Sequence, residues 1–150
     1  MEFRKARMED APIIQKLIEE GGKENLLLPR SLSEIYEKIR DFWVVCESGK
    51  VVGCCALHPV WENLAEIRSL VVKKGWRSKG IGRRLVEKSI EEAKSLGIEK
   101  VFVLTSIPHY FEKMGFRKIP KENLPHKVWK DCLQCPYFPN CKEESLIRDL

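Results

Sequence analysis

The sequence has no long apolar run, and its longest apolar stretches, such as Cys54–Leu57 and Leu70–Val72, extend over only a few residues. A membrane-spanning helix needs about 20 consecutive apolar residues, so we expect no segment that crosses a bilayer and no membrane partner. The first residues, Met1–Arg7, are charged and lack the apolar stretch of a signal peptide. These absences predict a cytoplasmic protein.

Internal repeats, low-complexity segments and linkers are also absent from the sequence. A chain of 150 residues can bury roughly two thirds of its extended surface, so it needs no disulfide to fold. With 43% apolar and 33% charged residues, its composition is that of a globular protein. We predict a single domain over residues 1–150, with a cysteine-containing C-terminal tail from about residue 125.

The net charge of +5 arises from 27 basic and 22 acidic residues that are spread along the chain. This modest excess is compatible with plain solubility, with a small phosphorylated ligand or with nucleic acid. Because the basic residues are not clustered enough for nucleic acid, we expect no such partner.

Apolar periodicity predicts a mixed α/β fold. Strands are expected at residues 2–7, Phe42–Glu47, Val51–Leu57, Leu64–Val72, Val101–Leu104 and Phe116–Ile119. Helices are expected at residues 10–20, ending at Gly21 and Gly22, and at residues 32–40, 81–96 and 108–114. Because Val101–Leu104 is wholly apolar, it is expected near the centre of the sheet. This order predicts a mixed sheet with helices on both faces.

The segment from Leu70 to Arg84 is the most informative part of the sequence, because it joins a strand to an amphipathic helix through an R-x-x-G-x-G motif. Glycines allow close backbone approach to a ligand, and the unpaired N–H groups that open a helix attract anions. Four cations surround the motif: Arg77, Lys79, Arg83 and Arg84. A pyrophosphate fits such a site, although an ordinary glycine-containing turn with solvated cations is the alternative. The spacing is neither that of a nucleotide P-loop nor that of a dinucleotide fingerprint.

Three segments resemble the GNAT superfamily of acetyl-CoA-dependent N-acetyltransferases: A-E-I-R-S-L-V-V (65–72), R-S-K-G-I-G (77–82) and P-H-Y-F-E-K-M-G-F (108–116). The resemblance implies a GNAT-like fold with a mixed, mostly antiparallel sheet, acetyl-CoA as cosubstrate, and a homodimer as one expectation. It also implies a coenzyme A site. In that implied site the pantetheine arm pairs with Leu70, Val71 and Val72, and the pyrophosphate is held by Arg77, Ser78, Lys79, Gly80, Ile81, Gly82 and Arg83.

Three further segments resemble the acetyltransferase domain of N-acetylglutamate synthases: residues 26–31, 54–58 and 122–141. The last of these, at the C-terminus, resembles the short, stand-alone members of that group. This resemblance implies acetyl transfer to the α-amine of L-glutamate, the first step of arginine biosynthesis. An amino-acid-kinase-like domain is not expected in front of the chain, so arginine feedback through it is not assumed. Acetylation of another small amine or a protein amine, and a non-catalytic acetyl-CoA sensor, are the alternatives.

Direct acetyl transfer needs a base for the ammonium and an acid for the leaving thiolate. The resemblance points to Glu66 as base, directly or through water, although pairing with Arg68 is the alternative interpretation. It points to Tyr110 as acid, although packing beside Phe111 is its alternative. His109 is the second candidate for the acid.

A glutamate substrate carries two carboxylates, which arginine and lysine recognise best. The candidates are Arg30, Arg68 and Lys127, each of which could instead be a solvated surface cation. Ser69 and His58 are weaker candidates for lining the pocket.

The six cysteines fall into two groups. Three lie in apolar strands and are expected to be buried thiols: Cys46, Cys54 and Cys55. Three cluster near the C-terminus: Cys132, Cys135 and Cys141. This second group could hold a structural zinc with His126 as fourth ligand, but it lacks two C-x-x-C pairs. A disulfide and reduced packing thiols are the other open interpretations.

Overall fold

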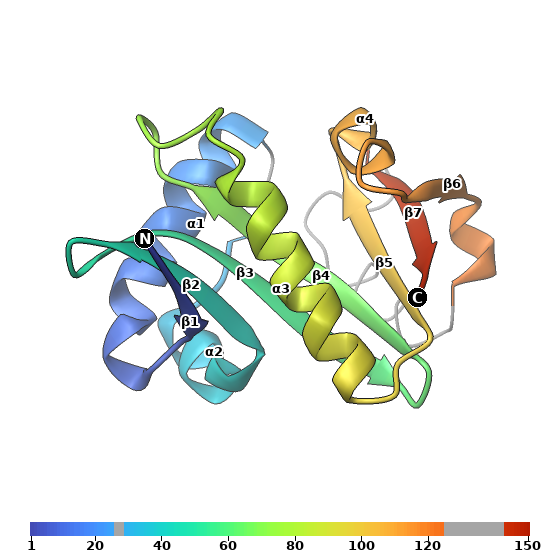
Figure 1. The fold of residues 1–150 in the computed structure, drawn as a ribbon, viewed down its shortest axis with the longest axis horizontal. Helices are drawn as coiled ribbons and strands as arrows, with labels where there is room; N and C mark the ends of the chain where they lie inside the picture. Colours follow the sequence, from blue (N-terminus) through green and yellow to red (C-terminus); the bar gives the residue numbers. More distant parts are fainter. Residues whose placement is uncertain (26–28, 125–142) are drawn as a thin grey trace.

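The computed structural model describes residues 1–25, 29–124 and 143–150, and within these ranges it contains one seven-stranded sheet of order β1-β2-β3-β4-β5-β7-β6 (Figure 1). The strands are β1 (Glu2–Lys5), β2 (Phe42–Glu47), β3 (Lys50–Trp61), β4 (Leu64–Val72), β5 (Lys100–Thr105), β6 (Arg117–Ile119) and β7 (Glu144–Asp149). The α-helices are α1 (Ala11–Asn25), α2 (Leu32–Glu37), α3 (Ile81–Ser95) and α4 (Pro108–Glu112). Short 3-10 helices cover Met8–Asp10, Ile39–Asp41 and Lys121–Asn123.

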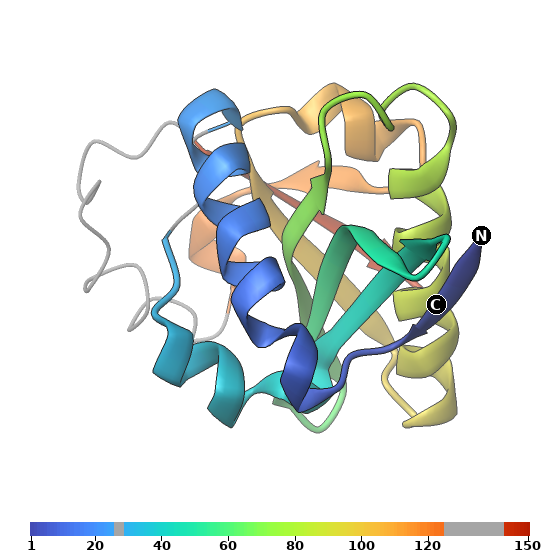
Figure 2. The same ribbon diagram turned by 90° about the vertical axis from the view of Figure 1, so that its left-hand side faces the viewer.

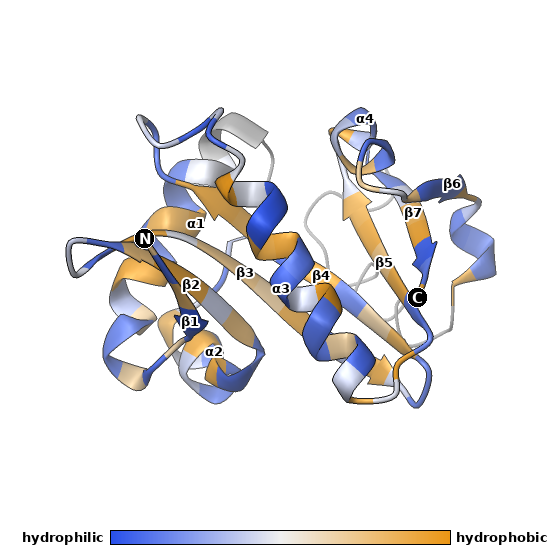
Figure 3. Cartoon of the chain, viewed as in Figure 1, coloured by the Kyte–Doolittle hydropathy of each residue, from blue (hydrophilic) through white to orange (hydrophobic). Residues whose placement is uncertain are grey.

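Helices cover both faces of the sheet, α3 on one side and α1 with α2 on the other (Figures 1 and 2). The apolar stripe of α3, including Leu85 and Ile90, packs against the central strands in one buried cluster. Ile14 and Leu17 of α1 belong to a second cluster on the opposite face. Figure 3 shows apolar residues concentrated in the central strands. Only β4 and β5 pair in parallel among the described strands, which confirms the mixed, mostly antiparallel sheet.

Most predicted elements are confirmed, with shifted ends. Helix α1 does not end at Gly21 and Gly22 but continues to Asn25. Glycine in a helix costs only about 1 kcal/mol, and Gly21 is buried, so tertiary packing outweighs propensity here. Helix α2 ends at Glu37, and a 3-10 turn then covers part of the predicted segment 32–40.

Strand β7 was not predicted, since the sequence analysis placed no element after Ile119. Its residues Glu144–Asp149 lie between β5 and β6, antiparallel to both. The segment offers only two adjacent apolar residues, Leu146 and Ile147, so it lacks the alternation that marks a strand. Its partners supply the missing signal, because β5 is an interior strand near the centre of the sheet, with β4 on one side and β7 on the other.

No helix within the described ranges is long and apolar enough to cross a bilayer.

The start of the chain is fixed by Asp10, whose carboxylate accepts hydrogen bonds from Arg4 at 2.7 and 3.1 Å and from the Arg7 backbone N–H at 2.7 Å. Burial works to raise the pKa of Asp10, but these donors outweigh it and lower the pKa below its ordinary value. The ionised Asp10 carboxylate therefore stabilises the folded state fully at pH values above the pKa of an unfolded Asp, about 3.9. This stabilisation is lost as the pH falls through the lower pKa that Asp10 has in the folded state.

Asp10→Asn should lower the free energy of unfolding by about 2 kcal/mol at pH 7, because it leaves the Arg4 guanidinium without its anionic partner. Urea unfolding from pH 7 to pH 3 measures the effect, and the difference from wild type should shrink in acid. The exposed Glu9→Gln variant is the control. A difference that stays constant over this pH range would contradict the assignment.

Candidate active site

A bulge in β4 separates this strand from β5 and opens the site. Val71 lies opposite Cys54 whereas Arg68 lies opposite Ala56, so β4 carries one extra residue there. Ser69 in the bulge has a φ of 53°, a left-handed conformation that is unusual for a residue with a Cβ atom. The parallel pairing of β4 with β5 covers only Leu64–Ile67, before the bulge. Beyond it the two strands diverge, as Figure 1 shows.

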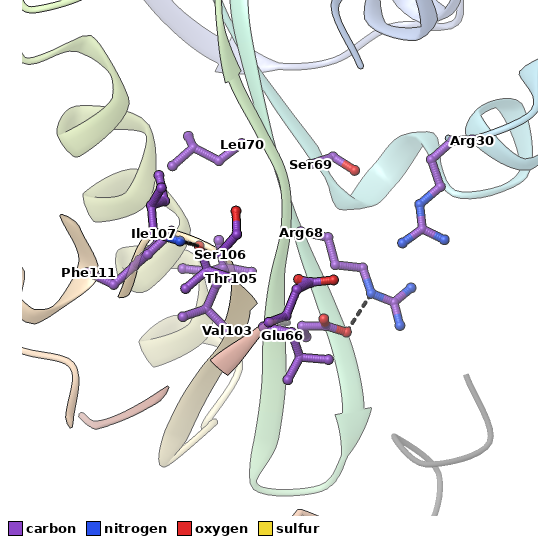
Figure 4. Close-up of a pocket in the computed structure, with 13 residues that line it drawn as sticks. Arg30, Glu66, Arg68, Ser69, Leu70, Val103, Thr105, Ser106, Ile107 and Phe111 are labelled. Atoms are coloured by element: carbon purple, nitrogen blue, oxygen red, sulfur yellow. Dashed lines mark hydrogen bonds and ion pairs between the residues drawn. The ribbon is translucent and has the colours of Figure 1, made fainter. Parts of the chain in front are cut away.

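A pocket of about 100 Å³ lies where the two strands part (Figure 4). Its walls come from the bulged part of β4, from the end of β5 and the turn after it, from α4, and from the residues before α2 and β7. These residues are Glu66, Ile67, Arg68, Ser69, Leu70, Val103, Leu104, Thr105, Ser106, Ile107, Phe111, Arg30 and Glu143. The sequence analysis missed the β5 end, although the carboxyl end of a buried parallel strand is a general position for ligand sites.

Charged side chains gather on one side of this pocket. Arg68 Nε donates to Glu66 Oε1 at 2.6 Å, and both side chains are only 10% exposed. Arg30 precedes α2, where it forms an ion pair of 3.0 Å with Glu34. A second hollow adjoins the pocket and shares Arg30, Arg68 and Ser69 with it. The structure therefore brings Glu66 and two of the predicted substrate cations together, and it also forms the Glu66–Arg68 pair that was the alternative interpretation.

The loop before α3 has the backbone geometry of an anion site. Gly80 is the N-cap of α3 with a φ of 77°, and Ser78 also lies in the left-handed region with a φ of 64°. Arg77 Nε donates to the Val72 carbonyl at 2.9 Å, which ties the loop to the end of β4. Lys79 lies over the Trp76 ring. The helix has 15 residues, so its first N–H groups and its dipole favour an anion at this end.

Tyr110 is a residue of α4, and its hydroxyl reaches the opening of α3 at Gly82. A Cβ atom on Gly82 would collide with the Tyr110 hydroxyl, so the absence of a side chain at Gly82 makes room for the phenol. The Tyr110 ring also packs edge-to-face on Phe111 at 5.3 Å. Burial, and to a smaller degree Cys55, raises the pKa of Tyr110 above its ordinary value, while Arg83 opposes this. The hydroxyl therefore stays protonated at neutral pH.

Tyr110 is not among the residues that line the pocket, whereas Phe111 of the same helix is. The structure thus does not bring the predicted base and acid into one pocket. Lys127, Cys132, Cys135, Cys141 and His126 lie outside the described residues. The other three cysteines are buried free thiols, as expected.

Comparison with known proteins assigns the chain to a family. The model of the acetyltransferase (GNAT) family matches residues 12–116. An uncharacterized N-acetyltransferase of Chlorobaculum tepidum is 44% identical over 147 residues, 98% of this chain and 95% of that protein. An amino-acid acetyltransferase of Mycobacterium tuberculosis is 39% identical over 120 residues, 77% of this chain and 68% of that protein.

A solved structure agrees with these matches. N-acetylglutamate synthase from Neisseria gonorrhoeae, complexed with coenzyme A and N-acetyl-glutamate, has a TM-score of 0.90 at 29% identity. The match covers 99% of this chain but 35% of the synthase chain, so this chain spans about a third of that protein. The chain belongs to the GNAT family of acetyltransferases. It is an N-acetyltransferase related to amino-acid acetyltransferases and to N-acetylglutamate synthase.

Proposed function

We propose that this enzyme transfers the acetyl group of acetyl-CoA to the α-amine of L-glutamate. The observation that carries the proposal is the convergence of Arg30, Arg68 and Glu66 where β4 and β5 part. Two guanidinium groups suit an acceptor with two carboxylates, whereas a polycationic acceptor would need an acidic cleft. The relatives named for amino-acid acetylation support the same class of acceptor.

The residues present fit acetyl-CoA. The α3 opening, with Gly80 in the left-handed conformation at the N-cap, has the unpaired N–H groups and the helix dipole that would hold a pyrophosphate. The cleft between β4 and β5 would take the pantetheine arm. When bound, acetyl-CoA supplies an activated acetyl group, whose carbon forms a bond to the acceptor nitrogen while its bond to sulfur breaks.

Glu66 removes the proton that the ammonium must lose before its nitrogen can react. Arg68 donates to one oxygen of this carboxylate, Oε1, and so fixes its orientation. The carboxylate has a second oxygen that can accept a proton, either from the ammonium or through a water molecule. Arg30 and Arg68 hold the acceptor's carboxylates, so that its amine faces the acetyl group.

Tyr110 donates its hydroxyl proton to the thiolate that leaves. Its raised pKa keeps that proton in place at neutral pH. Its hydroxyl lies against Gly82 at the opening of α3, and Phe111 of the same helix lines the pocket. A pantetheine arm that runs from the pyrophosphate loop to the pocket would therefore pass α4.

Tyr110→Phe should lower kcat by roughly 10²-fold, because the thiolate would leave without a positioned acid. The aromatic contact with Phe111 is retained, so acetyl-CoA affinity should not change. Steady-state kinetics over pH 6–9 and calorimetry with coenzyme A measure the two effects. Tyr36→Phe is the matched control with expected wild-type turnover, since Tyr36 is an exposed tyrosine that does not line the pocket. Full activity of the phenylalanine variant over this range would remove Tyr110 from the mechanism.

Arg77→Ala should raise the KM for acetyl-CoA by roughly tenfold and leave the KM for glutamate unchanged, because it removes one charged donor near the pyrophosphate. Lys94→Ala, at the far end of α3, is the control. Equal acetyl-CoA KM values for the two variants would show that the loop does not bind the pyrophosphate.

The acceptor is tested by measuring coenzyme A release with each free amino acid in turn, with the product identified by mass. The proposal predicts that L-glutamate gives the fastest release and a product heavier by one acetyl group. It fails if glutamate gives no more release than the amine-free control, or if spermidine is the better acceptor.

A further inference from the structure

A buried thiol contacts the β4 bulge from the neighbouring strand. Cys54 on β3 is fully buried, and its Sγ donates to the Ser69 carbonyl oxygen at 3.4 Å. Burial raises the pKa of the Cys54 thiol, so it keeps the proton that this hydrogen bond needs. The S–H group is a weak donor, and here its acceptor is a backbone carbonyl of the bulge.

The carbonyl that Cys54 contacts belongs to a strained residue. Ser69 has a φ of 53°, which places it in a conformation that residues with a Cβ atom rarely adopt. Ser69 and Leu70 together stand opposite the single residue Cys55 in the β3–β4 pairing. Backbone strain persists only where the surrounding contacts stabilise it, and the Cys54 hydrogen bond is one such contact.

The same two bulge residues form part of the pocket. Both Ser69 and Leu70 line it. In Figure 4, Leu70 lies on the side of Ile107 and Phe111, and Ser69 on the side of Arg30. The orientation of the Ser69–Leu70 peptide therefore determines which backbone groups face a pantetheine arm in the cleft. A rotated peptide would present different groups and narrow the space between β4 and β5.

We propose that Cys54 is a positioning residue for acetyl transfer, whose thiol holds the Ser69 carbonyl and so fixes the bulge backbone that faces the acetyl-bearing arm. This inference rests on the proposed binding of acetyl-CoA in the cleft. It does not depend on which amine is the acceptor. Cys54 touches neither substrate; it acts through Ser69.

Cys55 provides a matched control. It is equally buried and adjacent in sequence, but its side chain points to the α3 face, where it accepts a hydrogen bond from Ser89 Oγ at 3.6 Å. Truncating either cysteine to alanine removes one buried sulfur atom, so the losses in core packing are similar. Only Cys54→Ala removes the donor to the bulge.

The experiment compares Cys54→Ala, Cys54→Ser and Cys55→Ala by calorimetry with two probes, acetyl-CoA and 3′-phosphoadenosine 5′-diphosphate. The second probe lacks the pantetheine arm, so the ratio of the two affinities isolates the contribution of the cleft. We expect Cys54→Ala to lower that ratio roughly tenfold, because the Ser69 carbonyl loses the donor that holds it. Cys54→Ser keeps a donor and should restore most of the ratio, and Cys55→Ala should leave it unchanged.

Amide hydrogen exchange without ligand gives an independent readout. The Ser69 and Leu70 amides should exchange faster in Cys54→Ala than in Cys55→Ala when the two variants are compared at temperatures equally far below their own Tm. The proposal is overturned if the two alanine variants show the same affinity ratio and the same exchange, or if serine gives no rescue while it folds normally. Failure of glutamate as acceptor would leave these results unchanged, whereas failure of wild type to bind acetyl-CoA would overturn the proposed function itself.

Discussion

Gly82→Asp is expected to abolish acetyl-CoA binding. The residue lies in the first turn of α3, where the helix dipole and the unpaired N–H groups favour an anion. A carboxylate there would add a negative charge to the anion site and repel the pyrophosphate. In addition, any Cβ atom on Gly82 meets the Tyr110 hydroxyl, so the phenol must also move.

Gly82→Ala separates these two effects, because it adds the Cβ atom without the charge. The clashing atom is the far end of the Tyr110 side chain, which can shift. We therefore expect the alanine variant to keep measurable coenzyme A affinity while the aspartate variant shows no binding heat in calorimetry. Wild-type affinity in the aspartate variant would mean that the pyrophosphate lies elsewhere.

Arg30→Ala should lower kcat/KM for glutamate by roughly 10³-fold, since truncating one member of a buried charge pair with the substrate has effects of this size. Most of the loss should appear in KM, because Arg30 lies on the side of the pocket away from α4 (Figure 4). The preference for glutamate over glutamine should flatten in parallel, because the cation that distinguishes carboxylate from amide is gone.

Arg117→Ala is the matched control for this variant, since Arg117 is an exposed arginine that pairs with Asp149 and does not line the pocket. Its kinetic constants should equal those of wild type. Acetyl-CoA affinity should be unchanged in both variants. An Arg30→Ala enzyme with an unaltered glutamate KM would remove this residue from the acceptor site.

The elements that local patterns define were predictable from the sequence. Strand β4 ends at Val72 and helix α3 begins at Ile81, as predicted, because the apolar spacing and the glycines between them are local signals. The Ser48–Gly49 turn of the β2–β3 hairpin was equally predictable, since both residues adopt the positive φ that such turns require.

Features that depend on distant partners were not predictable. The β4 bulge arises from a mismatch in pairing with β3, and no single residue type marks it. Strand β7 is recognisable only once β5 and β6 are in place beside it. Local propensity also placed the end of α1 too early, because burial of Gly21 outweighs its low helix propensity.

The residues of the candidate site could likewise be predicted singly, but most of their contacts with one another could not. Glu66, Arg68 and Arg30 were named separately, from motifs, and the fold brings them to one pocket although Arg30 is distant in the chain. The contact between Tyr110 and Gly82 could not be foreseen, because it joins two segments through a missing side chain. The contribution of Cys54 was equally hidden, since the sequence shows only a buried apolar strand residue.

The ratio of kcat/KM for L-glutamate to that for L-glutamine tests the central claim most directly, because the two acceptors differ only in one carboxylate. A pocket in which Arg30 and Arg68 hold two carboxylates should favour glutamate by roughly 10²-fold or more, because an amide leaves a cation without its partner. A ratio near one, in an enzyme that acetylates both, would contradict the account.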